Sequence, residues 1–198
     1  MKRFLLPLLA VLTAACARQP PVPADHFYRL PEPTLEALAE PLTKGVILVN
    51  PFQTDGLHNE RAIVYTKDAH AITLSRYHYS YWLDAPPRLV QDYLVEYLRA
   101  AKAAHVVVTD PGVGSQLSIS GRIVRLEQQL RGKSSRALIE LELRVDGSNT
   151  ARPLLLKDYH ADVPASDDSM EALVLAFQKG LDQIFGRFLT DTRAVLTH

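Results

Sequence analysis

Strict alternation of apolar and polar residues in the second half of the chain restricts the folds that it can adopt. One apolar face consists of Leu117, Ile119, Gly121 and Ile123, and a second of Ile139, Leu141, Leu143 and Val145. A period of two residues is typical of strands that bury one face. Residues 131–135, Arg-Gly-Lys-Ser-Ser, are expected to form the hairpin loop between them, and 153–163 to continue the meander as a third strand.

Two other segments have the helical period of three and four residues. The first follows Asp84, which we expect to be its N-cap, with Pro86 in the first turn. Its apolar face consists of Leu89, Val90, Tyr93, Leu94, Tyr97, Leu98 and Ala101. The second is expected to begin at Asp168, with Glu171 completing a capping box. Its apolar face consists of Leu173, Phe177, Leu181, Ile184, Phe185 and Phe188.

Shorter apolar runs in the first half predict further strands. They cover residues 26–30, 45–50, 61–66, 71–74 and 105–109. The run 45–50 is continuously apolar and ends at Pro51, which predicts a strand buried on both faces. Together these patterns predict a single α+β domain over residues 26–198, with a mixed, largely antiparallel sheet and two main helices packed on one of its faces.

The first fifteen residues are typical of a secretory signal peptide. Lys2 and Arg3 precede an uncharged stretch from residue 4 to residue 17. A helix that crosses a bilayer needs about 20 apolar residues, whereas this stretch is shorter and contains Pro7. We therefore expect residues 1–15 to be an export signal instead of a permanent membrane span.

Cys16 is the single cysteine of the chain and stands directly after this stretch. Thr13-Ala14-Ala15-Cys16 resembles the lipobox of bacterial lipoproteins, which implies cleavage before Cys16 and attachment of lipid to its sulfur. In such lipoproteins aspartate after the cysteine favours the inner membrane, so Ala17 implies the outer membrane. The alternative is an ordinary signal peptide with Cys16 as an incidental thiol. Residues 16–25 contain three prolines and are expected to form an extended tether between the lipid and the domain.

The sequence contains no pattern that predicts catalysis or a bound cofactor. Its seven histidines are scattered without metal-ligand spacing, no G-x-S-x-G motif is present, and residues 112–115 lack the Gly-Lys-Ser/Thr of a phosphate loop. The 22 basic residues balance the 22 acidic ones, so a nucleic-acid partner is not expected. We predict a protein without enzymatic activity, metal or cofactor apart from the lipid on Cys16; a deep pocket gathering histidines and carboxylates would favour an enzyme instead.

The most unusual stretch is 75–82, Ser-Arg-Tyr-His-Tyr-Ser-Tyr-Trp. It contains four aromatic residues: Tyr77, Tyr79, Tyr81 and Trp82. On an extended strand the three tyrosines would share one face and the tryptophan would lie on the other. These residues either pack into the core beside the first helix or form a recognition surface, because tyrosine and tryptophan are enriched in binding hot spots. The second hypothesis assigns all four residues to partner binding.

The order of features along the chain resembles the ABC-type transport auxiliary lipoproteins, the family of paraquat-inducible protein C. The features are the lipobox and tether, Phe-Tyr-Arg-Leu at 27–30, Gly-Val-Ile-Leu-Val-Asn-Pro-Phe at 45–52, Arg-Ala-Ile-Val-Tyr-Thr at 61–66, Tyr77 with Trp82, a Pro-Pro-led helix with Leu94 and Leu98, a long hairpin and a C-terminal helix. The resemblance covers nearly the whole chain.

The resemblance implies a non-enzymatic component of a lipid transport system. Its expected place is the periplasmic face of the outer membrane, where it would dock a mammalian-cell-entry (MCE) domain protein that works with an inner-membrane ABC transporter or permease. Ring-shaped partners of this kind make self-association an additional expectation. The alternatives are a lipoprotein that activates a cell-wall synthase or assists outer-membrane assembly, and a direct lipid carrier.

Overall fold

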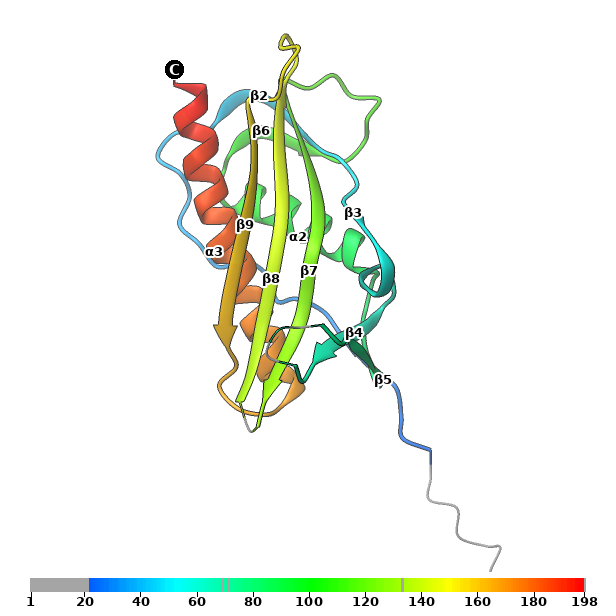
Figure 1. Cartoon of the computed structure of the whole chain (residues 1–198). Coiled ribbons are helices and arrows are strands. Elements are labelled where there is room, and N and C mark those ends of the chain that lie inside the picture. The colour runs from blue at the N-terminus through cyan, green and yellow to red at the C-terminus, as the bar shows by residue number, and fades with distance from the viewer. Residues whose placement is uncertain (1–21, 69, 71, 133, 198) are drawn as a thin grey trace, which may run out of the picture.

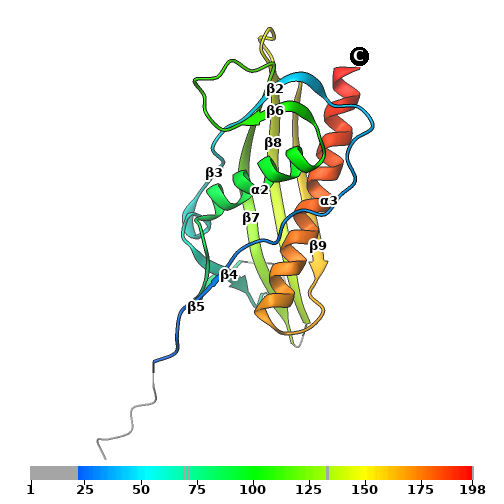
Figure 2. The ribbon, with the colours of Figure 1, turned by 180° about the vertical axis from the view of Figure 1, so that it is seen from behind.

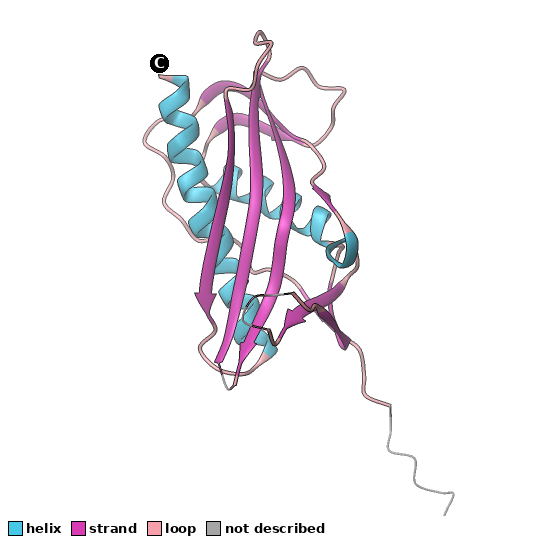
Figure 3. Ribbon diagram, in the orientation of Figure 1, coloured by secondary structure: helices cyan, strands magenta, loops and turns pink. Residues whose placement is uncertain are grey.

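The computed structural model describes residues 22–68, 70, 72–132 and 134–197. The predicted signal peptide 1–15, Cys16 and the first part of the tether lie outside the described residues. The strands are β1 (His26–Tyr28), β2 (Thr43–Val49), β3 (Gln53–Thr54), β4 (Ala62–Thr66), β5 (Ser75–Trp82), β6 (Ala104–Val108), β7 (Leu117–Arg131), β8 (Ser134–Gly147) and β9 (Leu155–Pro164). The helices are the 3-10 turn η2 (Gly56–Asn59), α2 (Pro86–Ala100) and α3 (Met170–Leu196) (Figure 3).

The long strand β7 organises a nine-stranded mixed sheet. One edge of β7 pairs with β8, which pairs in turn with β9, and these three strands form the predicted antiparallel meander (Figure 1). Along the other edge, β2, β3 and β4 pair in succession, each parallel to β7. The aligned residues are Ile47 with Leu117, Gln53 with Arg122 and Val64 with Glu127. The sheet continues through β6 beside β2, and through β5 and β1 beside β4.

A β-bulge in β7 changes which residues face the helices. The register against β8 shifts between Ile123 and Arg125, and Val124 is 43% exposed. Before the bulge Ile123 aligns with the core residue Leu141, whereas after it Leu126 aligns with the core residue Ile139. The alternation that predicts the strand therefore changes phase at Val124, as expected for one inserted residue.

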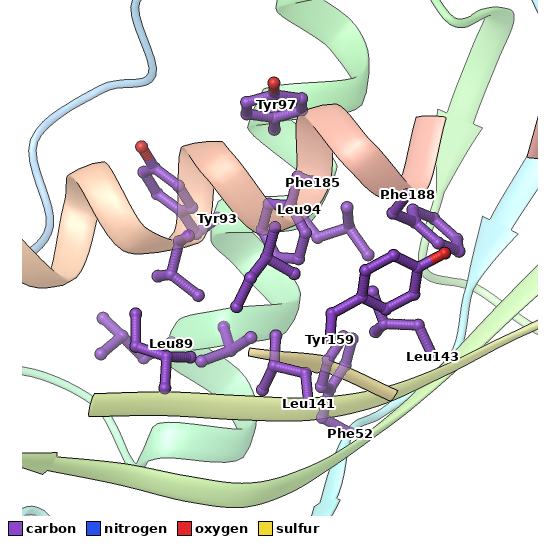
Figure 4. Close-up of a cluster of buried hydrophobic side chains, with 14 of the residues drawn as sticks. Phe52, Leu89, Tyr93, Leu94, Tyr97, Leu141, Leu143, Tyr159, Phe185 and Phe188 are labelled. Atoms are coloured by element: carbon purple, nitrogen blue, oxygen red, sulfur yellow. The ribbon is translucent and has the colours of Figure 1, made fainter. Parts of the chain in front are cut away.

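Both helices cover the same face of the sheet, as predicted (Figure 2). α3 lies along β8 and β9, and α2 crosses β6, β7 and β2. Figure 4 shows the core between these layers, where the Tyr97 and Phe185 rings meet edge to face with centroids 5.6 Å apart, and the Tyr159 and Phe188 rings do so at 5.9 Å. The structure thus confirms the predicted α+β domain.

The helices also make polar contacts with each other and with the N-terminal part of the chain. The Tyr93 hydroxyl of α2 donates to Asp182 Oδ1 of α3 at 2.7 Å. Residues 29–42, the strap, run from β1 across α3 to β2 (Figure 2). Gln178 Nε2 and Arg193 Nη2 donate to the carbonyl oxygens of residues 32 and 40 at 3.1 and 2.6 Å, so α3 holds the strap at two points.

The predicted caps of both helices are each wrong by one residue. Ala85, not Asp84, is the N-cap of α2, and its backbone is extended because it precedes Pro86. Proline at both of the first two helical positions removes one of the N–H groups that a capping side chain would bind. At α3 the N-cap is Ser169, whose Oγ accepts from the Ala172 N–H at 3.1 Å.

The predicted strand at 71–74 is also wrong, since the described residues 72–74 form a loop and β5 begins at Ser75. The Asp68 carboxylate accepts from the backbone N–H groups of His70 and Ile72, at 2.9 and 3.1 Å. These bonds lower the pKa of Asp68, the His70 bond contributing most. The local aspartate turn therefore binds backbone groups that a strand would offer to a neighbour.

Candidate functional site

Pairing of β1 with β5 builds an aromatic surface from two distant parts of the chain. The strands run parallel and align Phe27 with Tyr81. Their rings stack with centroids 5.6 Å apart and an interplanar angle of 28°. We call the surface formed by Phe27, Arg61, Arg76, His78 and Tyr81, together with Tyr79, whose ring centroid lies 6.4 Å from that of His78, the aromatic corner.

Trp82 does not belong to this surface. Its side chain is 1% exposed, and its ring meets Phe177 of α3 edge to face with centroids 5.3 Å apart. Trp82 therefore packs into the core, as the first of the two interpretations expects. Its enclosed ring is not accessible to a partner.

Tyr77 has a mainly structural environment. Its hydroxyl donates to Gln128 Oε1 at 2.6 Å, and Gln128 Nε2 donates to Ser135 Oγ at 2.8 Å. The Tyr77 ring also contacts Tyr65 with centroids 4.6 Å apart. Burial raises the pKa of Tyr77. These contacts join β5, β7 and β8, so Tyr77 fixes the strand that carries the more exposed tyrosines.

Tyr79 and Tyr81 lie at the surface, where binding by them stays a prediction. Tyr79 is 40% exposed, and Tyr81 is partly covered by Phe27, which is itself 54% exposed. The Tyr81 hydroxyl donates to the His78 carbonyl oxygen. The sequence placed Phe27 in a strand but gave no signal that this strand pairs with β5, so Phe27 was absent from the predicted site.

Charged side chains surround the aromatic rings. The Arg61 guanidinium carbon lies 5.1 Å from the Phe27 ring centroid, and Arg61 Nε donates to the Trp82 carbonyl oxygen at 3.1 Å. Arg76 pairs with Glu60. An open hollow of about 450 Å³ between these groups is lined by Asp25, Phe27, Glu60, Arg61, Ala62, Arg76, Tyr77, His78 and Tyr81. The hollow therefore offers aromatic faces together with charges of both signs.

A second candidate surface is the face of β7, β8 and β9 opposite the helices, which we call the outer face. Its side chains are mostly charged: Arg122, Arg136, Glu140, Glu142, Arg144, Asp158, His160 and Asp162. The arginines form ion pairs with acidic groups, such as Arg122 with Asp55 at 2.8 Å and Arg136 with Asp162 at 2.6 Å. Paired charges on a long exposed sheet suit polar contacts with another macromolecule.

A contact between a histidine and a carboxylate is buried between η2 and β7. His58 Nε2 lies 3.2 Å from Glu127 Oε1, and the side chains are 10% and 5% exposed. Arg125 Nε lies 3.6 Å from the other carboxylate oxygen. Across the described residues, no three histidine, cysteine, aspartate or glutamate side chains gather closely enough to hold a metal ion. The contact thus connects η2 to the sheet and stands apart from the aromatic corner's hollow.

Another polar cluster lies where β9 meets α3. Lys157 Nζ and the Tyr159 hydroxyl both donate to Asp191 Oδ2, each at 2.8 Å. These two donors hold the pKa of Asp191 below its usual range. The cluster connects the last strand to the last helix at the protein surface.

Residues 28–187 match the sequence profile of a family described as the ABC-type transport auxiliary lipoprotein component. The chain belongs to this family. The match covers nearly all of the folded domain and confirms the resemblance found in the order of sequence features. No curated protein matches this auxiliary lipoprotein significantly.

Two solved structures share the fold of the auxiliary lipoprotein. Protein XCC0632 from Xanthomonas campestris, of the domain family DUF330, has a TM-score of 0.76 at 18% sequence identity and covers 86% of this chain and 95% of its own. An uncharacterized protein has a TM-score of 0.69 at 14% identity, over 85% of this chain and 98% of its own. Within the part of the auxiliary lipoprotein that the structure describes, no helix is long and apolar enough to cross a membrane.

Proposed function

We propose that this auxiliary lipoprotein is anchored through lipid on Cys16 to the periplasmic face of the outer membrane and docks an MCE-domain protein of an ABC-type lipid transport system. The observation that carries the proposal is the family match over residues 28–187, preceded by the lipobox-like sequence that ends at Cys16. The role is non-enzymatic, because the domain would act by holding a partner at the membrane.

The fold supports a role in which the domain holds a partner at the membrane. The chain enters the domain at β1, the edge strand beside β5. The strap that follows accepts hydrogen bonds from Gln178 and Arg193 of α3. Lipid on Cys16 would therefore hold a stably packed domain through a proline-containing tether. The acyl chains of a lipoprotein contribute about 0.8 kcal/mol for each buried methylene group, so two or three chains suffice without a membrane-spanning helix.

The outer face is the proposed docking surface for the MCE protein. Both helices cover the opposite face, and on this side the part around Arg144, Asp158 and His160 stays open, whereas Glu127, Gln129 and Leu138 nearer the β7–β8 hairpin are buried (Figure 1). The open part of β8, residues 139–147, is about 30 Å long. A surface of this length can supply the roughly 1,000 Å² that a specific interface needs, and its arginines and carboxylates suit a polar rim.

The proposal is tested by photo-crosslinking in cells. A photoreactive amino acid at Arg144 on the outer face should capture an MCE protein, and the same group at Leu175, a 54% exposed position on α3, serves as the control. Self-association would appear as multiples of the mass of the mature chain that begins at Cys16. Capture of a cell-wall synthase or an outer-membrane assembly protein, without any MCE protein at either position, would reject the proposal. Phospholipid retained in native mass spectra of Cys16→Ser would indicate a lipid carrier instead.

A further inference from the structure

The chain enters the folded domain at the aromatic corner. β1 begins at His26, ten positions after Cys16, and Phe27 is its middle residue. A fully extended chain spans at most about 3.6 Å per residue, so the tether reaches no further than about 36 Å. α3 alone has 27 residues and a length of about 40 Å. The domain is thus longer than its tether, and the aromatic corner is the part that the tether keeps closest to Cys16.

Apolar side chains are exposed at this same place. Phe27 is 54% exposed, Tyr79 is 40% exposed, and Val22 on the segment leading into β1 is 81% exposed. Single exposed apolar residues are common on protein surfaces. Here, however, Phe27 and Tyr81 stack beside a hollow where the chain enters the domain. The amphipathic ring of tyrosine is favoured at the headgroup level of a bilayer, and an apolar ring such as that of Phe27 is favoured at the boundary between headgroups and acyl chains.

The charges around the hollow match a zwitterionic surface. Arg61 contributes a guanidinium group, which binds phosphate, and Asp25 contributes a carboxylate, which binds ammonium, beside the ion pair of Arg76 with Glu60. A phosphatidylethanolamine headgroup carries a phosphate and an ammonium. A lining with both signs therefore suits this headgroup better than a purely anionic one.

We propose that the aromatic corner rests on the bilayer that holds the lipid of Cys16, with Phe27 and Tyr79 at headgroup level. This inference depends on the lipid anchoring proposed for Cys16 and adds the part of the domain that contacts the membrane. With the corner on the bilayer, the segment 109–116 at the other end of the domain points away from the membrane (Figures 1 and 2).

The test uses lipidated protein purified from membranes and reconstituted into vesicles of phosphatidylethanolamine and phosphatidylglycerol. In half of the samples the lipids carry bromine near the glycerol backbone, which quenches tryptophan fluorescence on contact. Phe27→Trp places an indole in the corner, and the unsubstituted protein gives the background from Trp82. We expect the added emission to shift to the blue in plain vesicles and to lose at least half of its intensity in brominated ones.

The matched control is Val113→Trp, at a 40% exposed position in the segment 109–116. Its emission should be the same in both kinds of vesicle. Thermal melting of both variants, compared with the parent protein, reports whether each keeps the fold.

Flotation of the same samples separates this inference from the anchoring on which it depends. Protein that fails to float with the vesicles contradicts both the anchor and the inference. Protein that floats, but whose Phe27→Trp emission is unchanged by bromine, overturns the membrane contact alone. If position 27 in addition captures a protein by photo-crosslinking in cells, the aromatic corner is a protein-binding site instead.

Discussion

Replacing Trp82 with alanine should destabilise the domain by about 3–5 kcal/mol, the range for removing a large buried aromatic side chain. The ring is 1% exposed and packs edge to face on Phe177, so its loss leaves a cavity between β5 and α3. Of this loss, about 0.5–1.5 kcal/mol belongs to the aromatic pair itself. A double-mutant cycle with Phe177→Leu isolates that share.

Thermal unfolding followed by near-ultraviolet circular dichroism measures the effect in protein that also carries Cys16→Ser, which removes the proposed lipidation site. For a domain of this size 1 kcal/mol corresponds to about 2–4 °C, so Tm should fall by roughly 6–20 °C. Tyr79→Ala on the same strand is the control, and it should change stability by no more than about 0.5 kcal/mol because Tyr79 is 40% exposed.

A fall in Tm smaller than about 3 °C for Trp82→Ala would refute the reasoning. It would mean that the ring contributes little to the core, and it would favour a role for Trp82 in partner recognition. An equally large effect of Tyr79→Ala would also contradict it, because the exposed and buried aromatics of β5 would then be indistinguishable.

Three further predictions concern the anchor, the sheet and the response to acid. Cys16→Ser should leave the domain folded but release it from membranes into the soluble fraction, as measured by fractionation and intact mass. Gly121→Val should destabilise the domain by about 1–3 kcal/mol in urea unfolding, because a Cβ atom there would lie 2.1 Å from the Phe52 ring. Asp191→Asn should cost less than about 1 kcal/mol at neutral pH, since its pair with Lys157 is exposed. Because the folded-state pKa of Asp191 is lowered, its stabilisation is present above the unfolded-state pKa of about 3.9 and is lost as pH falls through the folded value, so the two proteins should converge in acid.

Each of these predictions has its own contradicting result. If the Cys16→Ser protein stays in the membrane fraction, the result counts against the proposed lipid anchor. Gly114→Val, where a Cβ atom meets nothing within 4 Å, is the control for Gly121→Val, and equal losses for both would rule out the clash with Phe52. A stability difference between wild type and Asp191→Asn that grows as pH falls would have the wrong sign.

Local sequence patterns predicted the elements whose environment repeats along the chain. The alternation in β7 and β8 places Ile119, Ile139 and Leu141 in the core, as expected. The apolar stripes of α2 and α3 likewise face the sheet. These elements were predictable because one side of each is buried over its whole length, which leaves a regular period in the sequence.

Features that depend on distant contacts were not predictable in this way. Nothing near Phe27 indicates that β1 pairs with β5, and that pairing creates the aromatic corner. The bulge at Val124 and the buried pair of His58 with Glu127 likewise depend on strands brought together by the fold. The errors at the helix caps had a local cause, since two consecutive prolines and Ser169 determined where the helices begin.

The short pairing of β1 with β5 determines how the domain would respond to a pulling force on the proposed anchor. Tension from the membrane would act first on β1, which has only three residues, and then on the strap across α3. Rupture of β1 alone would add about 10 Å of slack, at 3.3 Å per residue, while β7, β8 and β9 stayed intact. This short strand would therefore detach from β5 before the pulling force reaches the core.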